Sequence, residues 1–292
     1  APFIPSGSGF QRLIVVPDGA MSAIPFDALT ISPPGKKANY KTLPYLLHQF
    51  SVSQQYSAQL MFQHFRKQAS GNFLALIDET LPGAKKESSV LHGMHAHVIP
   101  AQSVSKARFK KMLELPSLLH LGMHGGVDAE QGNEPFLLVP TEEPQKVYAQ
   151  EIYNLSLRAQ LITLTACETG TGDEARGEGV LSMARAFSYA GCPAMVASLW
   201  KLPDLFTADL SESFYKLVRD RAPLDVALQQ AKRDFLQSAD EYKSHPANWG
   251  GLVLIGKIDS VRTPESQRSK NILISLVMLA GAWVALLILN RK

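Results

Sequence analysis

The stretch LITLTACETGTGDEARGEG, residues 161–179, decides the fold. It begins with a short apolar and β-branched run, residues 161–165, and passes directly into a glycine-rich turn that carries Cys167. A second stretch, LLHLGMHGG at residues 118–126, repeats this arrangement with His124 as the reactive side chain. Each pattern predicts a buried strand followed by a turn, and functional residues of parallel sheets follow the carboxyl ends of their strands. The two stretches therefore predict one site at one edge of a sheet.

Similar apolar runs recur between helical patterns along the whole chain. They lie at residues 12–16, 73–77, 95–99, 118–122, 161–165 and 195–199. Apolar residues at helical spacing fill the gaps near residues 180–190, 210–218 and 224–235, and Asp204 and Pro223 stand near the starts of the last two helices. This alternation predicts an α/β fold in which helices sandwich a mostly parallel sheet.

Composition excludes several classes of function. The chain has 292 residues, of which 46% are hydrophobic and 19% charged, and its net charge of +3 is spread over separated lysines and arginines. Without a dense basic stripe, nucleic acid is not an expected partner. Two cysteines without metal-ligand spacing predict neither a disulfide framework nor a metal site. The glycine-rich turn lacks the GK[ST] ending of a phosphate loop, so we expect no cofactor.

The carboxy-terminal part of the sequence predicts a membrane anchor. Residues 272–289, ILISLVMLAGAWVALLIL, are an unbroken apolar run, and about 18 such residues suffice to span a bilayer. We expect a transmembrane helix at residues 271–290, a polar juxtamembrane linker at residues 259–270, and one domain over residues 1–258. A buried core helix is the alternative. Basic residues flank both ends of the run, so they favour a cytoplasmic main domain only weakly, and a free thiol agrees with that side.

Cys167 and His124 together could perform acyl transfer if their two strands are neighbours. A thiol becomes a nucleophile as its thiolate, and an imidazole can accept that proton and later donate one to a leaving amine. Gly125 allows close approach of the backbone, so its N–H and that of Cys167 could form an oxyanion hole. On spacing alone, core roles for the cysteine and the histidine remain the alternative.

Several longer motifs resemble those of the CHAT domain family. They are ACETG (166–170), GEGV (177–180), ARAFSYAGCPAMVASLW (184–200) and HPANWGGLVLIG (245–256), preceded by VPDGAMSAIPFDAL and HLGMHGG, so the resemblance covers about residues 13–256. The family belongs with caspases, gingipains and separases, which share a fold and a His/Cys dyad. The resemblance implies that His124 is the general acid/base, that Cys167 is the nucleophile, and that the source is bacterial.

Other residues have competing interpretations. His120 is a second candidate histidine, but its place inside the strand pattern favours a core residue, and we interpret Cys192 as packing. Asp204 ends a stretch, LWKLPD, that is similar to one in separases, which implies a pocket for Arg or Lys; the alternative is that it caps a helix beginning at Leu205. Thr165 stands where metacaspase-like enzymes carry a pocket aspartate, so that source of basic specificity is missing.

The sequence therefore predicts a cysteine endopeptidase that cleaves proteins after a basic residue. The chain begins at Ala1 without an initiator methionine, so we expect it to continue upstream, where repeats or a regulatory partner could gate the site. The expected location is the cytoplasmic face of a membrane, with a single carboxy-terminal span. The alternative is a catalytically silent scaffold or interaction module at the membrane.

Overall fold

The computed structural model describes residues 11–33, 35, 39–57, 72–165 and 176–263. The predicted nucleophile Cys167 and the predicted transmembrane helix at residues 271–290 lie outside these residues. Within the described ranges, none of the helices combines the length and the apolar character needed to cross a bilayer. Residues 259–263, the described part of the predicted linker, include two buried side chains, those of Val261 and Thr263.

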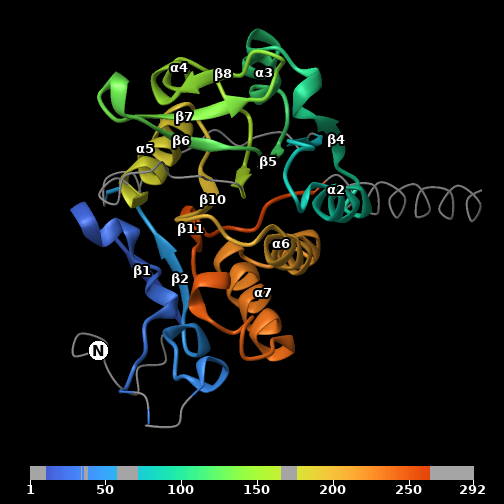
Figure 1. The fold of residues 1–292 in the computed structure, drawn as a ribbon. Helices are drawn as coiled ribbons and strands as arrows, with labels where there is room; N and C mark the ends of the chain where they lie inside the picture. Colours follow the sequence, from blue (N-terminus) through green and yellow to red (C-terminus); the bar gives the residue numbers. More distant parts are fainter. Residues whose placement is uncertain (1–10, 34, 36–38, 58–71, 166–175, 264–292) are drawn as a thin grey trace, which may run out of the picture.

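A large sheet forms the centre of the molecule (Figure 1), with eight strands among the described residues in the order β1-β2-β11-β10-β9-β5-β3-β4. The strands are β1 Arg12–Val15, β2 Ser51–Gln54, β3 Phe73–Ile77, β4 His97–Pro100, β5 Leu118–Gly122, β9 Leu161–Leu164, β10 Ala194–Ser198 and β11 Leu252–Gly256. Only the pairing of β10 with β11 is antiparallel among these described strands. The predicted mostly parallel sheet is confirmed.

Helices cover both faces of this sheet (Figure 1). On one face lie α2 Ala84–Gly93, α6 Asp204–Arg219 and α7 Leu224–Ser238, and on the other lie α3 Lys106–Leu113, α4 Ala149–Tyr153 and α5 Arg176–Tyr189. Alternate residues of one strand enter different cores: Leu118 packs with α6 and α7, and Leu119 packs with α3 and α5. Because both faces are buried, the central strands are continuous apolar runs rather than alternating ones.

Short elements complete the fold. A second sheet, antiparallel, consists of β6 Gly125–Asp128, β7 Glu134–Val139 and β8 Gln145–Tyr148, and lies with α3, α4 and α5 (Figure 1). The 3-10 helices are η1 Gly19–Ala23, η2 Phe26–Ala28, η3 Tyr40–Thr42, η4 Leu46–His48, η5 Ala101–Ser103, η6 Ala129–Gln131 and η7 Pro246–Asn248. The second sheet begins immediately after His124, so it sets the path of the chain beyond that residue.

A buried ion pair joins the amino-terminal part of the chain to the last long helix. Lys232 of α7 is fully buried, and its Nζ lies 2.5 Å from Asp27 Oδ2 in η2. The same ammonium lies 5.6 Å from the centre of the Trp249 ring. The second carboxylate oxygen of Asp27 has no hydrogen-bond partner among the described residues. The ammonium is therefore the main partner that this buried carboxylate has.

Candidate active site

The two strands that carry the predicted dyad are neighbours. β5 and β9 pair in parallel register from Leu118 with Leu161 to Leu121 with Leu164, and the N–H of Thr165 donates to the carbonyl of Leu121 at 3.2 Å. Both strands end at the same edge of the sheet. The predicted neighbourhood of these two strands is confirmed, and the dyad itself stays a prediction because Cys167 lies outside the described residues.

His124 lies between the large sheet and the small one. The strand before it ends at Gly122, whose carbonyl accepts a hydrogen bond from the N–H of Asp78 at 2.7 Å. The carbonyl of His124 itself accepts from the N–H of Leu138 in β7 at 2.8 Å. The side chain is partly exposed, whereas Met123 beside it is fully buried. The backbone on both sides of the histidine is thus fixed, and the residue is partly exposed although its ring Nδ1 is buried.

Gly125 has a structural reason to be glycine. A Cβ at this position would lie 3.0 Å from the carbonyl oxygen of Phe136 and 3.3 Å from Leu137 Cδ2, both in β7. The close approach of β6 to β7 therefore leaves little room for a side chain. An oxyanion role for the Gly125 N–H is compatible with this packing and stays a prediction.

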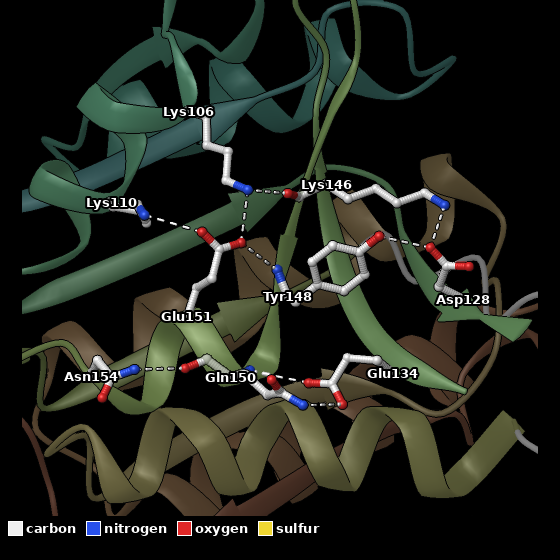
Figure 2. A network of polar contacts seen from close by, with 9 residues as sticks. All are labelled: Lys106, Lys110, Asp128, Glu134, Lys146, Tyr148, Gln150, Glu151 and Asn154. Atoms are coloured by element: carbon white, nitrogen blue, oxygen red, sulfur yellow. Dashed lines mark hydrogen bonds and ion pairs between the residues drawn. The ribbon is translucent and has the colours of Figure 1, made fainter. Parts of the chain in front are cut away.

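Polar contacts hold the small sheet in place (Figure 2). Asp128 at the end of β6 accepts hydrogen bonds from Lys146 Nζ and from the Tyr148 hydroxyl, each at 2.7 Å. The hydrogen bond from Lys146, and next that from Tyr148, lower the pKa of the Asp128 carboxyl. This carboxylate therefore ties the strand that follows His124 to the far strand of its sheet.

Glu151 of α4 connects the small sheet to α3 (Figure 2). Its carboxylate accepts from Lys106 at 2.8 Å and Lys110 at 3.1 Å, both on α3, and from the backbone N–H of Tyr148 at 3.2 Å. Lys106 also donates to the carbonyl of Lys146 at 2.7 Å. These contacts fix the small sheet relative to α3 and α4. They thereby also fix β6, the strand that follows His124.

Asp204 is the first residue of α6 and lies against the start of α2. Pro203, not Asp204, occupies the N-cap position of α6, so this helix begins one residue earlier than predicted. The two helices touch so closely that a Cβ on Gly83 would lie 2.4 Å from Asp204 Cβ. Lys86 of α2 also forms an ion pair of 2.5 Å with Asp209 of α6, which joins the two helices one turn further along.

The charge of Asp204 is coupled to the rest of the site. The pKa of its carboxyl is raised, chiefly by burial and also by the nearby carboxylate of Glu87. Three groups act in the opposite direction and lower this pKa, namely Lys201, the N–H of Gly83 and His124. Asp204 and His124 are thus close enough to interact electrostatically, although they are 80 residues apart in sequence. The structure brings these two predicted site residues to the same region.

Two other predicted assignments are confirmed. His120 is fully buried, with Nε2 3.0 Å from Glu87 Oε1 and Nδ1 2.9 Å from the Tyr215 hydroxyl, so it is a core histidine. Cys192 is buried and its thiol donates to the carbonyl of Ala194 at 3.1 Å. Burial raises the pKa of this thiol to about 12, which makes it unreactive at neutral pH.

Sequence reasoning missed Glu87. Its carboxylate lies beneath the site and also accepts a hydrogen bond from the Thr165 hydroxyl at 2.9 Å. One signal was present, since Ala84, Glu87 and Leu91 form the buried stripe of α2 at helical spacing. An acidic residue on such a stripe needs a polar partner inside the fold.

The CHAT domain profile matches residues 2–257. The chain belongs to the CHAT domain family. Among curated proteins, human tetratricopeptide repeat protein 28 is 29% identical over 118 residues, which are 40% of this chain and 5% of that protein. The mouse protein of the same name is 27% identical over the same length. The chain thus spans only a small part of these relatives.

Solved structures share the fold at low sequence identity. Separase of Saccharomyces cerevisiae, in its complex with securin, has a TM-score of 0.51 and 16% identity, covering 75% of this chain and 14% of that one. The complex of the RgpB pro- and mature domains of Porphyromonas gingivalis has a TM-score of 0.55 and 11% identity, covering 88% and 67%. The CHAT chain therefore has the fold of caspase-like cysteine peptidases, as its motifs implied.

Proposed function

We propose that this CHAT domain is a cysteine endopeptidase, with His124 as general acid/base and Cys167 as nucleophile. The observation that carries the proposal is the parallel pairing of β5 with β9, because both strands end at the same edge of the sheet, with His124 two residues beyond the one and Cys167 three residues beyond the other in sequence. The fold of caspase-like cysteine peptidases supports the same chemistry. Burial and an elevated pKa exclude Cys192 as the nucleophile.

In the proposed mechanism, His124 accepts the proton of the Cys167 thiol. The thiolate attacks the carbonyl carbon of the scissile peptide bond, and the N–H groups of Gly125 and Cys167 stabilise the resulting oxyanion. His124 then donates its proton to the leaving amine as the C–N bond breaks. A water molecule, deprotonated by His124, hydrolyses the thioester and releases the carboxylate product and the free thiol.

We propose that Asp204 selects a basic side chain before the scissile bond. Its carboxylate is half-buried and interacts electrostatically with His124, which supports a place beside the reacting groups. A buried carboxylate that forms a charge-assisted hydrogen bond with a guanidinium or ammonium group favours that group strongly over a neutral one.

The first test is cleavage of fluorogenic peptides ending in Arg, Lys, Asp or Leu by the full-length chain in detergent. We expect Arg and Lys peptides to be cut, and Cys167→Ala and His124→Ala to reduce kcat by about 10³-fold or more. Asp204→Asn should lower kcat/KM for the Arg peptide by about 10- to 100-fold, roughly 1.4 to 2.7 kcal/mol.

The matched control is Asp220→Asn, which removes an exposed carboxylate just beyond the other end of α6 and should change nothing. Cleavage that persists in Cys167→Ala would contradict the peptidase proposal. An undiminished preference for Arg over Leu peptides in Asp204→Asn would contradict the specificity proposal alone.

A second candidate function is a scaffold. The specific observation that favours it is the similarity to tetratricopeptide repeat proteins, in which the matching region is 5% of the whole chain. We also propose that such repeats, or a separate partner, gate the peptidase site. An effect that survives Cys167→Ala supports the scaffold, whereas an effect that requires the thiol supports the peptidase.

We further propose that residues 271–290 anchor the domain to the cytoplasmic face of a membrane. The unbroken apolar run at residues 272–289 supports this proposal. Carbonate extraction of membranes that contain the full chain, followed by protease protection, tests it. Release of the chain into the soluble fraction would contradict it.

A further inference from the structure

One oxygen of Glu87 contacts both strands that lead to the proposed dyad. Glu87 Oε1 lies 3.0 Å from Nε2 of His120 in β5, and the Thr165 hydroxyl at the end of β9 donates to the same oxygen at 2.9 Å. His120 precedes His124 by four residues, and Thr165 precedes Cys167 by two. A single carboxylate thus bridges the middle of β5 and the residue that follows β9.

The two ring nitrogens of His120 have different neighbours. Nε2 lies 3.0 Å from Glu87 Oε1 and 3.4 Å from the Thr165 hydroxyl, and Nδ1 lies 2.9 Å from the hydroxyl of Tyr215 on α6. In the tautomer with the hydrogen on Nε2, the ring donates to Glu87 and Nδ1 accepts from Tyr215. Burial raises the pKa of Tyr215, so this hydroxyl keeps its proton and can donate it. The four side chains thus form one connected hydrogen-bond network.

The hydrogen bonds of Glu87 with His120 and Thr165 are buried. His120 is fully buried, and the Glu87 side chain is 8% exposed. In such surroundings a hydrogen bond is stronger than in water, and a group that loses its partner is not easily compensated by solvent. The contacts of Glu87 with His120 and Thr165 therefore restrict the relative position of β5 and β9.

The second oxygen of Glu87 approaches the end of β5. A Cβ on Gly122 would lie 2.7 Å from Glu87 Oε2, so the carboxylate packs directly on the backbone of the last residue of the strand. Only Met123 separates Gly122 from His124. At its other end, Glu87 is held by the first turn of α2, where its N–H donates to the carbonyl of Gly83 at 3.0 Å.

We propose that Glu87 is a positioning residue whose carboxylate, bonded to His120 and Thr165, sets the spacing between β5 and β9 and so aligns His124 with Cys167. Stability alone does not explain such a group, because well-packed apolar residues hold buried strands as firmly as buried charges do. This inference rests on the proposed function only in using the dyad as its readout.

The test uses the full-length chain and two measurements. The first is the rate at which iodoacetamide alkylates Cys167 as a function of pH, followed by mass spectrometry, with His124→Ala defining the rate without the dyad. The second is kcat and KM for the cleaved peptide. Thr165→Val is the main variant, because it removes the hydroxyl and keeps the shape of the side chain.

We expect Thr165→Val to reduce dyad-dependent alkylation at neutral pH by about tenfold and kcat by about 10- to 100-fold, because small misplacements of reacting groups have effects of this size. KM should stay within about twofold, since the substrate contacts are unchanged. Thr165→Ser and Glu87→Gln keep the donor and the acceptor and should recover most of the rate, whereas Glu87→Ala should not.

The matched control is Thr207→Val, at a buried threonine of α6 whose hydroxyl donates to the carbonyl of Pro203 at 3.3 Å. If Thr165→Val changes alkylation and kcat no more than Thr207→Val does, the inference is overturned while the peptidase proposal stands. If wild-type alkylation equals that of His124→Ala at every pH, the dyad itself fails, and the inference fails with it.

Discussion

Replacement of Lys232 by methionine should strongly destabilise the fold. Methionine fills nearly the same volume but removes the ammonium that lies 2.5 Å from Asp27 Oδ2. Asp27 would then be a buried carboxylate with no partner for either oxygen among the described residues. Removing one member of a buried ion pair typically costs about 3–5 kcal/mol. In a domain of this size, that loss corresponds to a fall in Tm of roughly 10 °C.

Urea unfolding followed by fluorescence is a suitable assay, because Trp249 lies 5.6 Å from the Lys232 ammonium. The matched control is Lys216→Met, which breaks an exposed ion pair of 2.6 Å with Glu212 on α6 and should cost less than about 1 kcal/mol. The double variant Asp27→Leu with Lys232→Met should recover most of the lost free energy, because it leaves no unpaired charge. The reasoning is refuted if Lys232→Met costs no more than Lys216→Met, or if the double variant is less stable than either single one.

Three further predictions concern the site and the small sheet. Hydrogen bonds lower the pKa of Asp128, so its carboxylate stabilises the fold at pH values above the usual aspartate pKa, and this stabilisation is lost as the pH falls through the lowered pKa. In Asp128→Asn, the urea midpoint should therefore decrease less steeply as the pH is lowered than it does in the wild type. Burial raises the pKa of Asp204, so its contribution to stability is full at low pH and is lost as the pH rises through the raised pKa. Because the carboxyl ionises over the same pH range, the preference of the enzyme for Arg over citrulline peptides should appear there. Gly122→Ala should cost about 1–3 kcal/mol in thermal denaturation, because its Cβ would lie 2.7 Å from both Glu87 Oε2 and Ile77 Cδ1, whereas Gly93→Ala, with open space around it, should not destabilise.

The central strands were predictable because their burial is continuous. β3 and β5 have the predicted bounds, since an apolar run that is covered on both faces is visible in the sequence. β4 begins two residues later than predicted because His95 adopts a left-handed conformation, with φ 59°, as the chain leaves α2. Such a conformation in a histidine is uncommon and has no signature in the local pattern.

Polar strands were not predictable. β2 has the polar sequence SVSQ and is nevertheless largely buried. Its Ser51 hydroxyl donates at 2.6 Å to Asp225, which follows Ser51 by 174 residues. β8, with the sequence QKVY, pairs with β7, and its Lys146 and Tyr148 side chains both contact Asp128 of β6. No local pattern reports a partner that distant in sequence, so propensity and periodicity favour a loop for such segments.

The candidate site divides in the same way. His124 follows a strand pattern and Asp204 ends a motif that resembles one in separases, so the sequence offered both as candidates. Glu87 becomes a candidate only from the structure, because its contacts with His120 of β5 and with Thr165 after β9 join segments that are far apart in sequence. Long-range contacts between single polar side chains are the part of a fold that a sequence pattern does not encode.

The position of β11 limits the order in which the chain can fold. Leu252–Gly256 is the last described strand in sequence, yet it lies between β2 and β10, and Gln55 donates from its side chain to the carbonyl of Gly256. Among the described strands, β1 and β2 join the rest of the large sheet through β11, so this connection forms only after β11 has emerged from the ribosome. Domains generally fold as units during synthesis, so β1 and β2, which pair with each other, can join the large sheet only when the end of the domain has been made. A chaperone that binds the nascent chain should therefore remain bound to residues 11–57 until translation of the domain is complete.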